Sequence, residues 1–548
     1  MTRDSADSPE RLQTVFDYHR ATKHRFQAYA RGPGYLEWAT QPDPFRRYAG
    51  ARLIALQAVP PADEPGYDAV FDPGRRPAPA AVNLQTVSQL FYDSLALSAW
   101  KSLGDTRWAL RVNASSGNLH PTEGYLICGP VEGLCDTPVV CHYAPQAHGL
   151  EVLAEFDAPH WRALSTRFPA QTFFMGLTSI HWREAWKYGQ RAYRYCMLDA
   201  GHALAAISMA AGGLGWQTRL LDALGTEDLA LLTGTFRDQD AEREEPDMLV
   251  ACVPAQQAPE ETGLPGAAVR SFASLAWQGS PNQLSPSHVE WGMEDIAQAV
   301  RKPRGEVEYE RFENPPVGWS LEARPVSLRR VIRQRRSAVA MDGLTCLSRD
   351  SFYRMLYRTL AVPGAVPFGT LPWKPHIHLA LFVHRVNDLS SGLYLLVRDP
   401  AQTGALRAAL SEANPWQSPP GCPEQLPLYC LIEAQTQAAA RQIACHQDIA
   451  SDGCFSLAML AEYGAPLARY GPWFYPRLYW EAGLIGQLLY LEAEAAGMRS
   501  TGIGCFFDDP MHEVLGLEDD AFQDLYHFTL GGPVEDTRLT NQSAYPDE

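Results

Sequence analysis

The sequence predicts two tandem, related domains that combine helices with strands. Three observations support this prediction. The chain has 548 residues, more than one hydrophobic core ordinarily serves. A helical segment of the first half recurs in the second, and a stretch rich in Pro, Gly and Ser separates the two. We therefore expect domains over 1–255 and 326–548, joined by a linker over 256–325.

The composition is that of a globular protein and excludes several partners. Hydrophobic residues make up 46% and charged residues 20% of the chain, and the formal net charge is −17. Such an acidic balance argues against a nucleic-acid or anionic-membrane surface. The start, MTRDSADSPERLQ, has no apolar signal region, and the 11 cysteines contain no C-x-x-C pair. We expect a cytoplasmic protein with reduced thiols and neither a nucleic-acid nor a membrane partner.

Hydrophobic spacing predicts the elements of the first half in order. Apolar side chains at helical spacing favour helices over 12–20 and 83–100. Short apolar runs predict strands at 124–130, 138–142 and 150–156. Residues 199–214 are apolar on nearly every side, which is typical of a helix buried in a core or an interface.

The second half repeats this helix. WKYGQRAYRYCMLDAG, from Trp186, aligns without a gap to RYGPWFYPRLYWEAG, from Arg469. Tyr188 then matches Tyr470 and Asp199 matches Glu481, all at the offset 470 − 188 = 282. One constant offset along a whole helix indicates an internal duplication.

The two copies are unequal. Arg335-Arg336-Ser337 corresponds to Arg20-Ala21-Thr22 at an offset of 315, so the second copy is shorter by 315 − 282 = 33 residues. The missing part includes SSGNLHPTEGY of the first copy, where the second copy has VPFGTLPWKPHIHL over 366–379.

Two of these segments contain ligand-binding residue types. Ser115, Ser116, Gly117 and Asn118 offer hydroxyls, an amide and a closely approachable backbone on a loop before a buried strand. The same residues are also ordinary turn formers. Arg335, Arg336 and Ser337 supply two guanidinium groups and a hydroxyl, which suit a phosphate dianion, although arginine pairs on solvated helices are common.

Together these motifs resemble the FMN-dependent nitroreductase family. TKHRFQAYARGPGYLEWATQPDPFRRY, SSGNLHPTEGY and WKYGQRAYRYCMLDAGHA are similar to the SagB/ThcOx-type dehydrogenases, which oxidise peptide thiazolines and oxazolines. The resemblance covers residues 10–250 closely and 326–548 more loosely. It departs from the family pattern at Ala114, where proline is usual.

The resemblance implies an α+β fold and an FMN site shared between two nitroreductase-like domains. In this chain the two repeats would form an intrachain pseudo-dimer, and further association of chains is left open. The phosphate would be held by Arg335, Arg336 and Ser337. The flavin ring would contact Ser115, Ser116, Gly117 and Asn118 of the first half. Gly502 and Gly504 of the second half would also bind the cofactor. The other composite site would pair Arg20, Thr22 and Lys23 with VPFGTLPW, so we predict one good FMN site.

The resemblance also implies a catalytic pair, Lys187 and Tyr188. Oxidation of an azoline requires removal of a proton from carbon while a hydride leaves, and a partly buried lysine can act as the base. Arg469 stands at the lysine position in the second copy, and arginine cannot release a proton near neutral pH. His376 and His378 have no evident third ligand, so no metal site is predicted.

The leading hypothesis is therefore an FMN-dependent dehydrogenase acting on a peptide- or amino-acid-derived heterocycle, with a cyclodehydratase as a possible biosynthetic partner. One alternative is an NAD(P)H-dependent nitro or quinone reductase, which has little need of Lys187. Another is a degenerate flavin-fold binding or scaffold protein, which would purify colourless.

Overall fold

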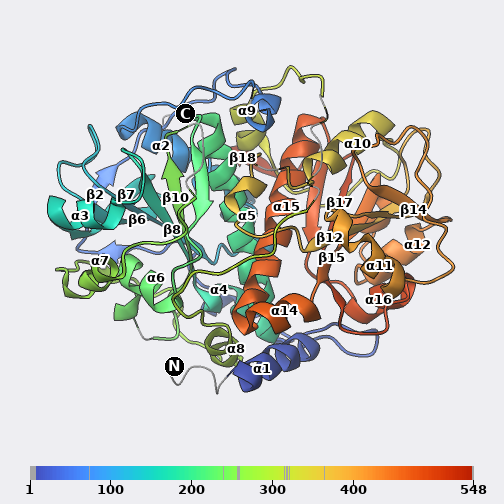
Figure 1. Ribbon diagram of the computed structural model, residues 1–548, viewed down its shortest axis with the longest axis horizontal. Helices are drawn as coiled ribbons and strands as arrows, with labels where there is room; N and C mark the ends of the chain where they lie inside the picture. The colour runs from blue at the N-terminus through green and yellow to red at the C-terminus, as the bar shows by residue number, and fades with distance from the viewer. Residues whose placement is uncertain are drawn as a thin grey trace.

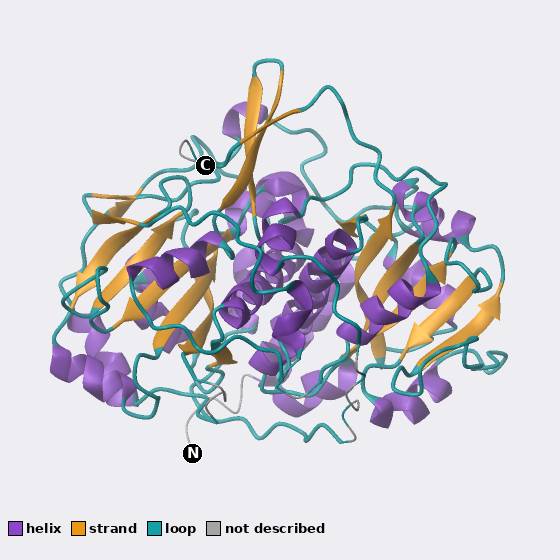
Figure 2. Cartoon of the chain, turned by 90° about the horizontal axis from the view of Figure 1, so that it is seen from above, coloured by secondary structure: helices purple, strands orange, loops and turns teal. Residues whose placement is uncertain are grey.

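The computed structural model describes residues 8–72, 74–238, 240–255, 260–313, 315, 319, 321–362 and 364–545. Two sheets lie on opposite sides of the molecule, one from each half of the chain (Figure 1). Two long helices, α5 (Ala192–Gly213) and α15 (Tyr475–Ala495), lie between them. Figure 2 shows the same layering from above, with helices between two groups of strands.

The two sheets have the same topology. The first has the order β2-β7-β6-β5-β8-β10-β9 and the second β14-β13-β12-β15-β17-β16, with antiparallel neighbours throughout. Adding seven to each label from β5 to β10 reproduces the second order, and β2 is an additional edge strand. The first sheet consists of β2 (Arg52–Ala55), β5 (Thr122–Cys128), β6 (Val139–Ala144), β7 (Gly149–Glu155), β8 (Phe173–Ser179), β9 (Gln217–Leu220) and β10 (Glu245–Val253). The second consists of β12 (Ile377–Val383), β13 (Gly392–Leu396), β14 (Leu428–Glu433), β15 (Phe455–Glu462), β16 (Arg499–Ile503) and β17 (Phe522–Gly531). The predicted duplication is therefore a duplication of the fold.

A pseudo-two-fold axis passes between α5 and α15. Tyr193 and its repeat equivalent Tyr475 stack at 6.5 Å between ring centroids. Gly201 and its equivalent Gly483 sit at the crossing. A Cβ at Gly201 would lie 2.3 Å from a carbonyl oxygen of α15, and a Cβ at Gly483 would lie 2.1 Å from a carbonyl oxygen of α5. Contact of residues with their own equivalents is the geometry of a two-fold dimer, here within one polypeptide.

A segment at the start of the first half contacts the second half, and a segment at the end of the second half contacts the first. The N-terminal α1 (Ser8–Ala21) reaches the second half, where His19 Nε2 lies 3.2 Å from Oε1 of Gln523. The C-terminal β18 (Thr540–Gln542) pairs with β3 (Leu97–Leu103), which also pairs with β4 (Thr106–Arg111). These exchanges bind the two halves into one unit.

The helix expected over 83–100 is only partly formed. Asn83 caps α2 (Leu84–Tyr92), and the chain then turns into β3, so Trp100 lies in a strand. The cause is α9 (Leu328–Gln334) of the second half. Arg333 Nη1 donates to the carbonyl oxygens of Tyr92 and Leu97, at 3.2 and 2.8 Å. The prediction of a continuous helix was wrong because this contact is not local in sequence.

The stretch expected to be a linker contains packed structure. β11 (Ser280–Pro281) pairs with β1 (Tyr48–Ala49), and α8 (Met293–Ala299) packs on α1. Side chains of α7 (Gly266–Arg270) are buried in a core of the first half. Residues 256–259, 314, 316–318 and 320 of this stretch lie outside the described residues. The domain limits given above stay a prediction.

Shorter helices complete both halves. They are α3 (Ala158–Ser165), α4 (His181–Tyr188), α6 (Thr226–Thr233), α10 (Arg349–Arg358), α11 (Thr403–Ala409), α12 (Gln437–Ile443), α13 (Ile449–Asp452), α14 (Gly464–Tyr470) and α16 (Asp508–Leu515). Among the described residues, no helix has both the length and the apolar character needed to cross a bilayer.

Candidate active site

A cavity of about 410 Å³ lies between the two halves and brings most of the predicted site residues together. Its volume falls within the range of roughly 300–1,000 Å³ that is usual for cofactor and ligand sites. The predicted residues on its wall are Ser115, Ser116, Gly117, Asn118, Tyr188, Arg335, Arg336, Ser337, Gly502 and Gly504. The Ser-Gly-Asn loop and the Arg-Arg-Ser segment therefore face one cavity from different halves.

One end of this cavity is a cluster of cations. Arg335 and Arg336 follow α9, and Lys101 comes from β3. Arg335 Nη2 donates to the carbonyl oxygen of Arg111 at 2.9 Å, and Arg336 Nη2 to that of Ser98 at 3.1 Å. In the part of the chain that the structure describes, neither arginine forms an ion pair.

The charge of Glu494 acts on both arginines, but this carboxylate pairs with Arg499 at 3.5 Å rather than with either of them. Burial, followed by the charges of Arg335 and other neighbouring arginines, lowers the pKa of Arg336 to about 9. Burial and the charge of Arg336 also lower the pKa of Lys101. A phosphate group would remove this repulsion and accept their hydrogen bonds. Ser337, whose Oγ lies 2.9 Å from Oη of Tyr490, supplies a hydroxyl beside them. This end of the cavity fits the phosphate of FMN.

The Ser-Gly-Asn loop also lines the cavity and has an unusual backbone conformation. Gly117 and Asn118 have φ values of 57° and 60°, in the left-handed region that glycine and asparagine tolerate best. Ser116 donates from its backbone N and from its Oγ to Asp199, both at 2.9 Å. Asn118 Nδ2 donates to the carbonyl oxygen of Ala109 at 2.9 Å. The loop is thus rigid before any ligand binds.

Lys187 and Tyr188, at the end of α4, face this loop. A Cβ added at Gly117 would lie 2.5 Å from Tyr188 Oη and 3.0 Å from Lys187 Nζ. Only glycine leaves room for both side chains at this position. Burial raises the pKa of Tyr188 well above its ordinary value, so the phenol stays protonated.

The two glycines expected near the cofactor leave space for tyrosines. A Cβ at Gly502 would lie 1.7 Å from Tyr526 Oη, and a Cβ at Gly504 would lie 2.3 Å from the ring of Tyr195. Tyr195 Oη also donates to the carbonyl oxygen of Gly504 at 3.0 Å. Both tyrosines line the cavity. The absence of side chains at the two glycines therefore lets the tyrosine rings form this part of its wall.

Two buried carboxyl groups beside the pair were not predicted. Burial raises the pKa of Asp199 to about 7. Burial, and then the charge of Asp199, raises the pKa of Glu184 well above its ordinary value. Neither carboxylate oxygen of Glu184 has a hydrogen-bond partner among the described residues. An acidic residue inside an otherwise apolar helix was the available signal for Asp199. Glu184 gave no comparable signal.

We expect Asp199→Asn to weaken the pH dependence of stability. The unfolded carboxyl titrates near 3.8 and the folded one near 7, so between these values only the folded state holds the proton. This contribution to stability is present below pH 3.8 and is lost as the pH rises to 7. From pH 5 to 7 it amounts to about 3 kcal/mol, at about 1.4 kcal/mol per pH unit. Melting curves at pH 5 and pH 8 should show a smaller decline for the variant, and an equal decline would contradict the assignment.

The second composite site expected from the resemblance does not form. Arg20 pairs with Asp17 at 2.7 Å on the surface, and Lys23 pairs with Asp509 at 3.0 Å. The acidic first turn of α16 thus binds the N-terminal cluster, which comprises Arg20, Thr22 and Lys23, near the first cavity. VPFGTLPW packs elsewhere, where Thr370 Oγ1 lies 2.6 Å from Oγ1 of Thr218. The two segments are not brought together.

The pseudo-two-fold axis relates the first cavity to a second position, which we call the pseudo-symmetric position. A tyrosine from the stretch between the domains lies there. Tyr309 donates its hydroxyl to Asp222, the repeat equivalent of Gly504. Its ring lies 5.3 Å from that of Tyr470, the equivalent of Tyr188, and 5.7 Å from that of Trp373. Tyr309 therefore occupies the space between the equivalents of Gly504 and Tyr188.

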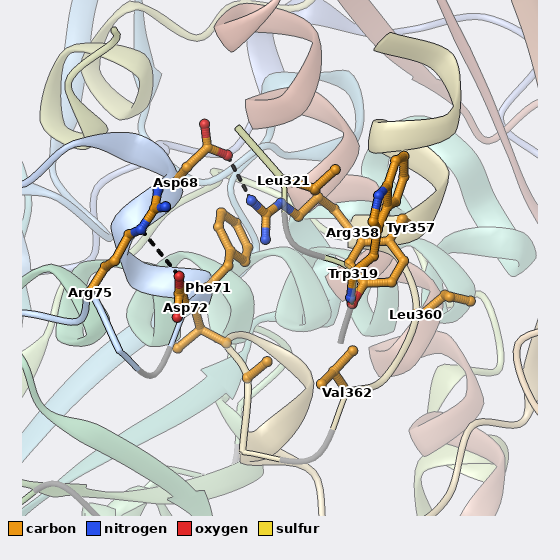
Figure 3. A pocket seen from close by; sticks show the side chains of 12 residues that line it. Asp68, Phe71, Asp72, Arg75, Trp319, Leu321, Tyr357, Arg358, Leu360 and Val362 are labelled. Atoms are coloured by element: carbon orange, nitrogen blue, oxygen red, sulfur yellow. Dashed lines mark hydrogen bonds and ion pairs between the residues drawn. The ribbon is translucent and has the colours of Figure 1, made fainter. Parts of the chain in front are cut away.

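A further cavity of about 310 Å³ lies between the 3-10 helix η3 (Tyr67–Phe71) and α10 (Figure 3). Its carboxylate Asp68 is paired with Arg324 at 2.9 Å and with Arg358 at 2.8 Å. Arg75 pairs with Asp72 at 3.3 Å on its rim. This charge cluster joins the two halves and includes none of the predicted site residues.

Comparison with solved structures identifies the fold. The chain is similar to the crystal structure of an Anabaena variabilis protein assigned as a nitroreductase, with 22% identity and a TM-score of 0.68 over 95% of this chain and 99% of that one. A Ralstonia eutropha protein of the same assignment matches at 15% identity and a TM-score of 0.28, over 42% of this chain and 100% of that one. The E. coli microcin synthetase McbBCD complex with truncated pro-MccB17 matches at 18% identity and a TM-score of 0.25, over 45% of this chain and 93% of that one.

No family sequence model matches the chain. No curated protein sequence matches it either. The fold is the nitroreductase fold, present twice in tandem as an intrachain pseudo-dimer. This confirms the predicted α+β class.

Proposed function

We propose that the protein is an FMN-dependent dehydrogenase that oxidises a thiazoline, an oxazoline or a related heterocycle derived from a peptide or amino acid. The observation that carries this proposal is the position of Lys187 and Tyr188 against Gly117, which lines a cavity that Arg335 and Arg336 also line. Because such heterocycles arise by cyclodehydration, we infer that a cyclodehydratase supplies the substrate.

The cavity residues divide into two sets by position. Arg335, Arg336 and Ser337 would hold the phosphate of FMN. The loop Ser115–Asn118, together with Gly502 and Gly504, would hold the ring system. FMN, when bound, supplies the two-electron acceptor. The left-handed loop and its bonds to Asp199 fix these groups in advance, which is how a protein stabilises charge as it develops.

Lys187 is the base in this proposal. In its neutral form it removes the proton from the azoline carbon as the hydride leaves. Tyr188 keeps its proton because burial raises its pKa, so it donates a hydrogen bond to the substrate. Glu184 lies beside them and also keeps its proton, because burial raises its pKa. It therefore carries no negative charge.

Anaerobic reaction with a synthetic thiazoline peptide tests the function. We expect the flavin absorbance to bleach while the peptide loses two hydrogens, as measured by mass spectrometry. Bleaching by NAD(P)H with no reaction of the peptide would favour a reductase. Protein that takes up no FMN would favour a binding or scaffold role.

We expect one FMN per chain. The pseudo-symmetric position is filled by Tyr309 and Trp373, and its equivalents of Tyr195 and Asp199 are Arg477 and Glu481. Arg477 Nε donates to Asp222 at 3.0 Å, and Glu481 is paired with Arg398. Release of flavin by denaturation, measured by absorbance against protein concentration, should give a ratio of one. A ratio of two would contradict the asymmetry.

A further inference from the structure

A buried tyrosine lies beside the phosphate end of the candidate active site. Tyr490 belongs to α15 and lines the cavity. Its hydroxyl oxygen lies 2.9 Å from Oγ of Ser337, and its ring centroid lies 5.0 Å from the guanidinium carbon of Arg335. Tyr490 therefore contacts two of the three residues that would hold the phosphate of FMN.

The hydrogen bonds of this hydroxyl have one favourable direction. The backbone N of Gly502 donates to Oη of Tyr490 at 2.9 Å. Among the described residues, the other hydrogen-bond contact of Tyr490 Oη is Oγ of Ser337. If Ser337 were the donor in that contact, the buried phenol proton would have no acceptor, and a buried donor without a partner is costly. Tyr490 therefore donates its proton to Ser337.

This direction leaves the proton of Ser337 available to a ligand. Ser337 is an exposed residue of the cavity wall. In the described part of the chain, its hydroxyl has no hydrogen-bond contact besides Tyr490. The side chains of Arg335, Arg336 and Lys101 carry donors only, so this end of the cavity presents donors throughout. Such a set fits a phosphate dianion, whose oxygens are all acceptors.

The ring of Tyr490 also supports the neighbouring arginine. Arg335 Nε and Nη2 donate to the carbonyl oxygens of Val112 and Arg111, at 3.1 and 2.9 Å. The cation–π contact with the ring of Tyr490 adds a further attraction. The guanidinium group is thus held in place before a ligand binds.

The first half has no counterpart to this tyrosine. At the repeat offset of 282, Tyr490 corresponds to Ser208 of α5 (490 − 282 = 208). Oγ of Ser208 lies 3.0 Å from Oγ1 of Thr218 and 3.0 Å from Oγ1 of Thr370. Its short side chain is therefore occupied inside the core. The contact of a tyrosine with the serine of the Arg-Arg-Ser segment thus belongs to the candidate active site and has no repeat equivalent.

We propose that Tyr490 is a positioning residue that orients the Ser337 hydroxyl as a hydrogen-bond donor to the phosphate group of the cofactor. This inference rests on the proposed function, because it takes the phosphate of FMN to lie at this end of the cavity. Tyr490 acts on the ligand through Ser337 and Arg335. Its hydroxyl therefore contributes to the binding of FMN and not to the binding of the same ring system without a phosphate.

FMN and riboflavin differ only in the phosphate group, so their dissociation constants test this role. Loss of a hydrogen bond to a charged group should raise the Kd of Ser337→Ala for FMN by roughly 10- to 100-fold. Tyr490→Phe should raise it by roughly three- to tenfold, because the serine hydroxyl is still present but no longer oriented. Phenylalanine keeps the ring beside Arg335, so this variant tests the hydroxyl alone. The Kd for riboflavin should change by less than about twofold in both variants.

Combining the two substitutions tests whether Tyr490 acts through the serine. The Kd of Tyr490→Phe/Ser337→Ala for FMN should equal that of Ser337→Ala, since residues in one hydrogen-bond chain are not additive. Titration of flavin fluorescence measures all these constants. Tyr394→Phe is the matched control, because it removes a buried tyrosine hydroxyl that donates to the carbonyl oxygen of Ser390 at 2.7 Å, away from the cavity. Its flavin binding should match that of the wild type.

Three results would overturn the proposal. One is an equal rise in the Kd for FMN and riboflavin in Tyr490→Phe, as a merely structural role would give. Another is a full, independent effect of Tyr490→Phe on top of Ser337→Ala. The third is an unchanged Kd of Ser337→Ala for FMN, which is decisive even if Tyr490→Phe does not fold, because Ser337 is exposed.

Inorganic phosphate separates this inference from the proposed function. It should raise the melting temperature of the wild-type apoprotein and raise that of Tyr490→Phe by less. An equal rise in both proteins would overturn the role of Tyr490. A wild type that phosphate stabilises in this way but that takes up no flavin would refute the dehydrogenase alone.

Discussion

Replacing Arg336 by alanine is expected to abolish retention of FMN during purification. Loss of one partner from a buried, hydrogen-bonded charge pair costs roughly 2–5 kcal/mol, so the Kd should rise by roughly 30- to 5,000-fold. Fluorescence titration with FMN measures this directly. The Kd of Arg336→Lys for FMN should lie between those of the wild type and Arg336→Ala, because lysine keeps the charge but loses the forked donor.

The same substitution should not weaken the protein without flavin. Burial, and then the charges of neighbouring arginines, lower the pKa of the partly buried Arg336 to about 9, so its removal relieves both the desolvation cost and the repulsion. The melting temperature of the apoprotein should be unchanged or higher. Arg330→Ala is the matched control, because Arg330 lies on α9, just before Arg336 in the chain, but pairs with Asp63 at the surface. Unchanged FMN affinity in Arg336→Ala would contradict the phosphate assignment.

Motif recognition predicted the composition of the cavity wall well, because each motif carries its own local chemistry. The Ser-Gly-Asn loop, the Arg-Arg-Ser segment, and Gly502 and Gly504 were named separately and line one cavity. The duplication was predictable because the repeat offset survives in the helix sequences. The roles of these residues stay predictions until they are measured.

What the sequence could not predict depends on contacts between distant segments. Nothing local marks Tyr309 as the residue at the pseudo-symmetric position, since its partner Asp222 lies 87 residues earlier, in the first predicted domain. The N-terminal cluster was misplaced for the same reason, because Asp509 attracts Lys23 across almost the whole chain. Gln487, whose Oε1 accepts from the backbone N of Ala114 at 3.1 Å, likewise joins the site from the second half.

Replacing Lys187 by alanine should lower the turnover of a thiazoline substrate by roughly 10²–10⁴-fold, the usual contribution of a positioned base. FMN affinity should fall far less than in Arg336→Ala, because Lys187 is not part of the cation cluster that would hold the phosphate. Anaerobic single-turnover bleaching of the flavin separates the two quantities.

Lys187→Arg is the informative companion to this variant. Arginine keeps the positive charge and much of the length but does not release a proton near neutral pH, so turnover should stay as low as in Lys187→Ala. The second half carries this residue naturally, since Arg469 stands at the equivalent position and pairs with Glu310 at 2.7 Å. If Lys187 served only to place a positive charge beside the ring, the arginine variant would recover activity. Its failure together with intact flavin binding would assign proton removal to Lys187.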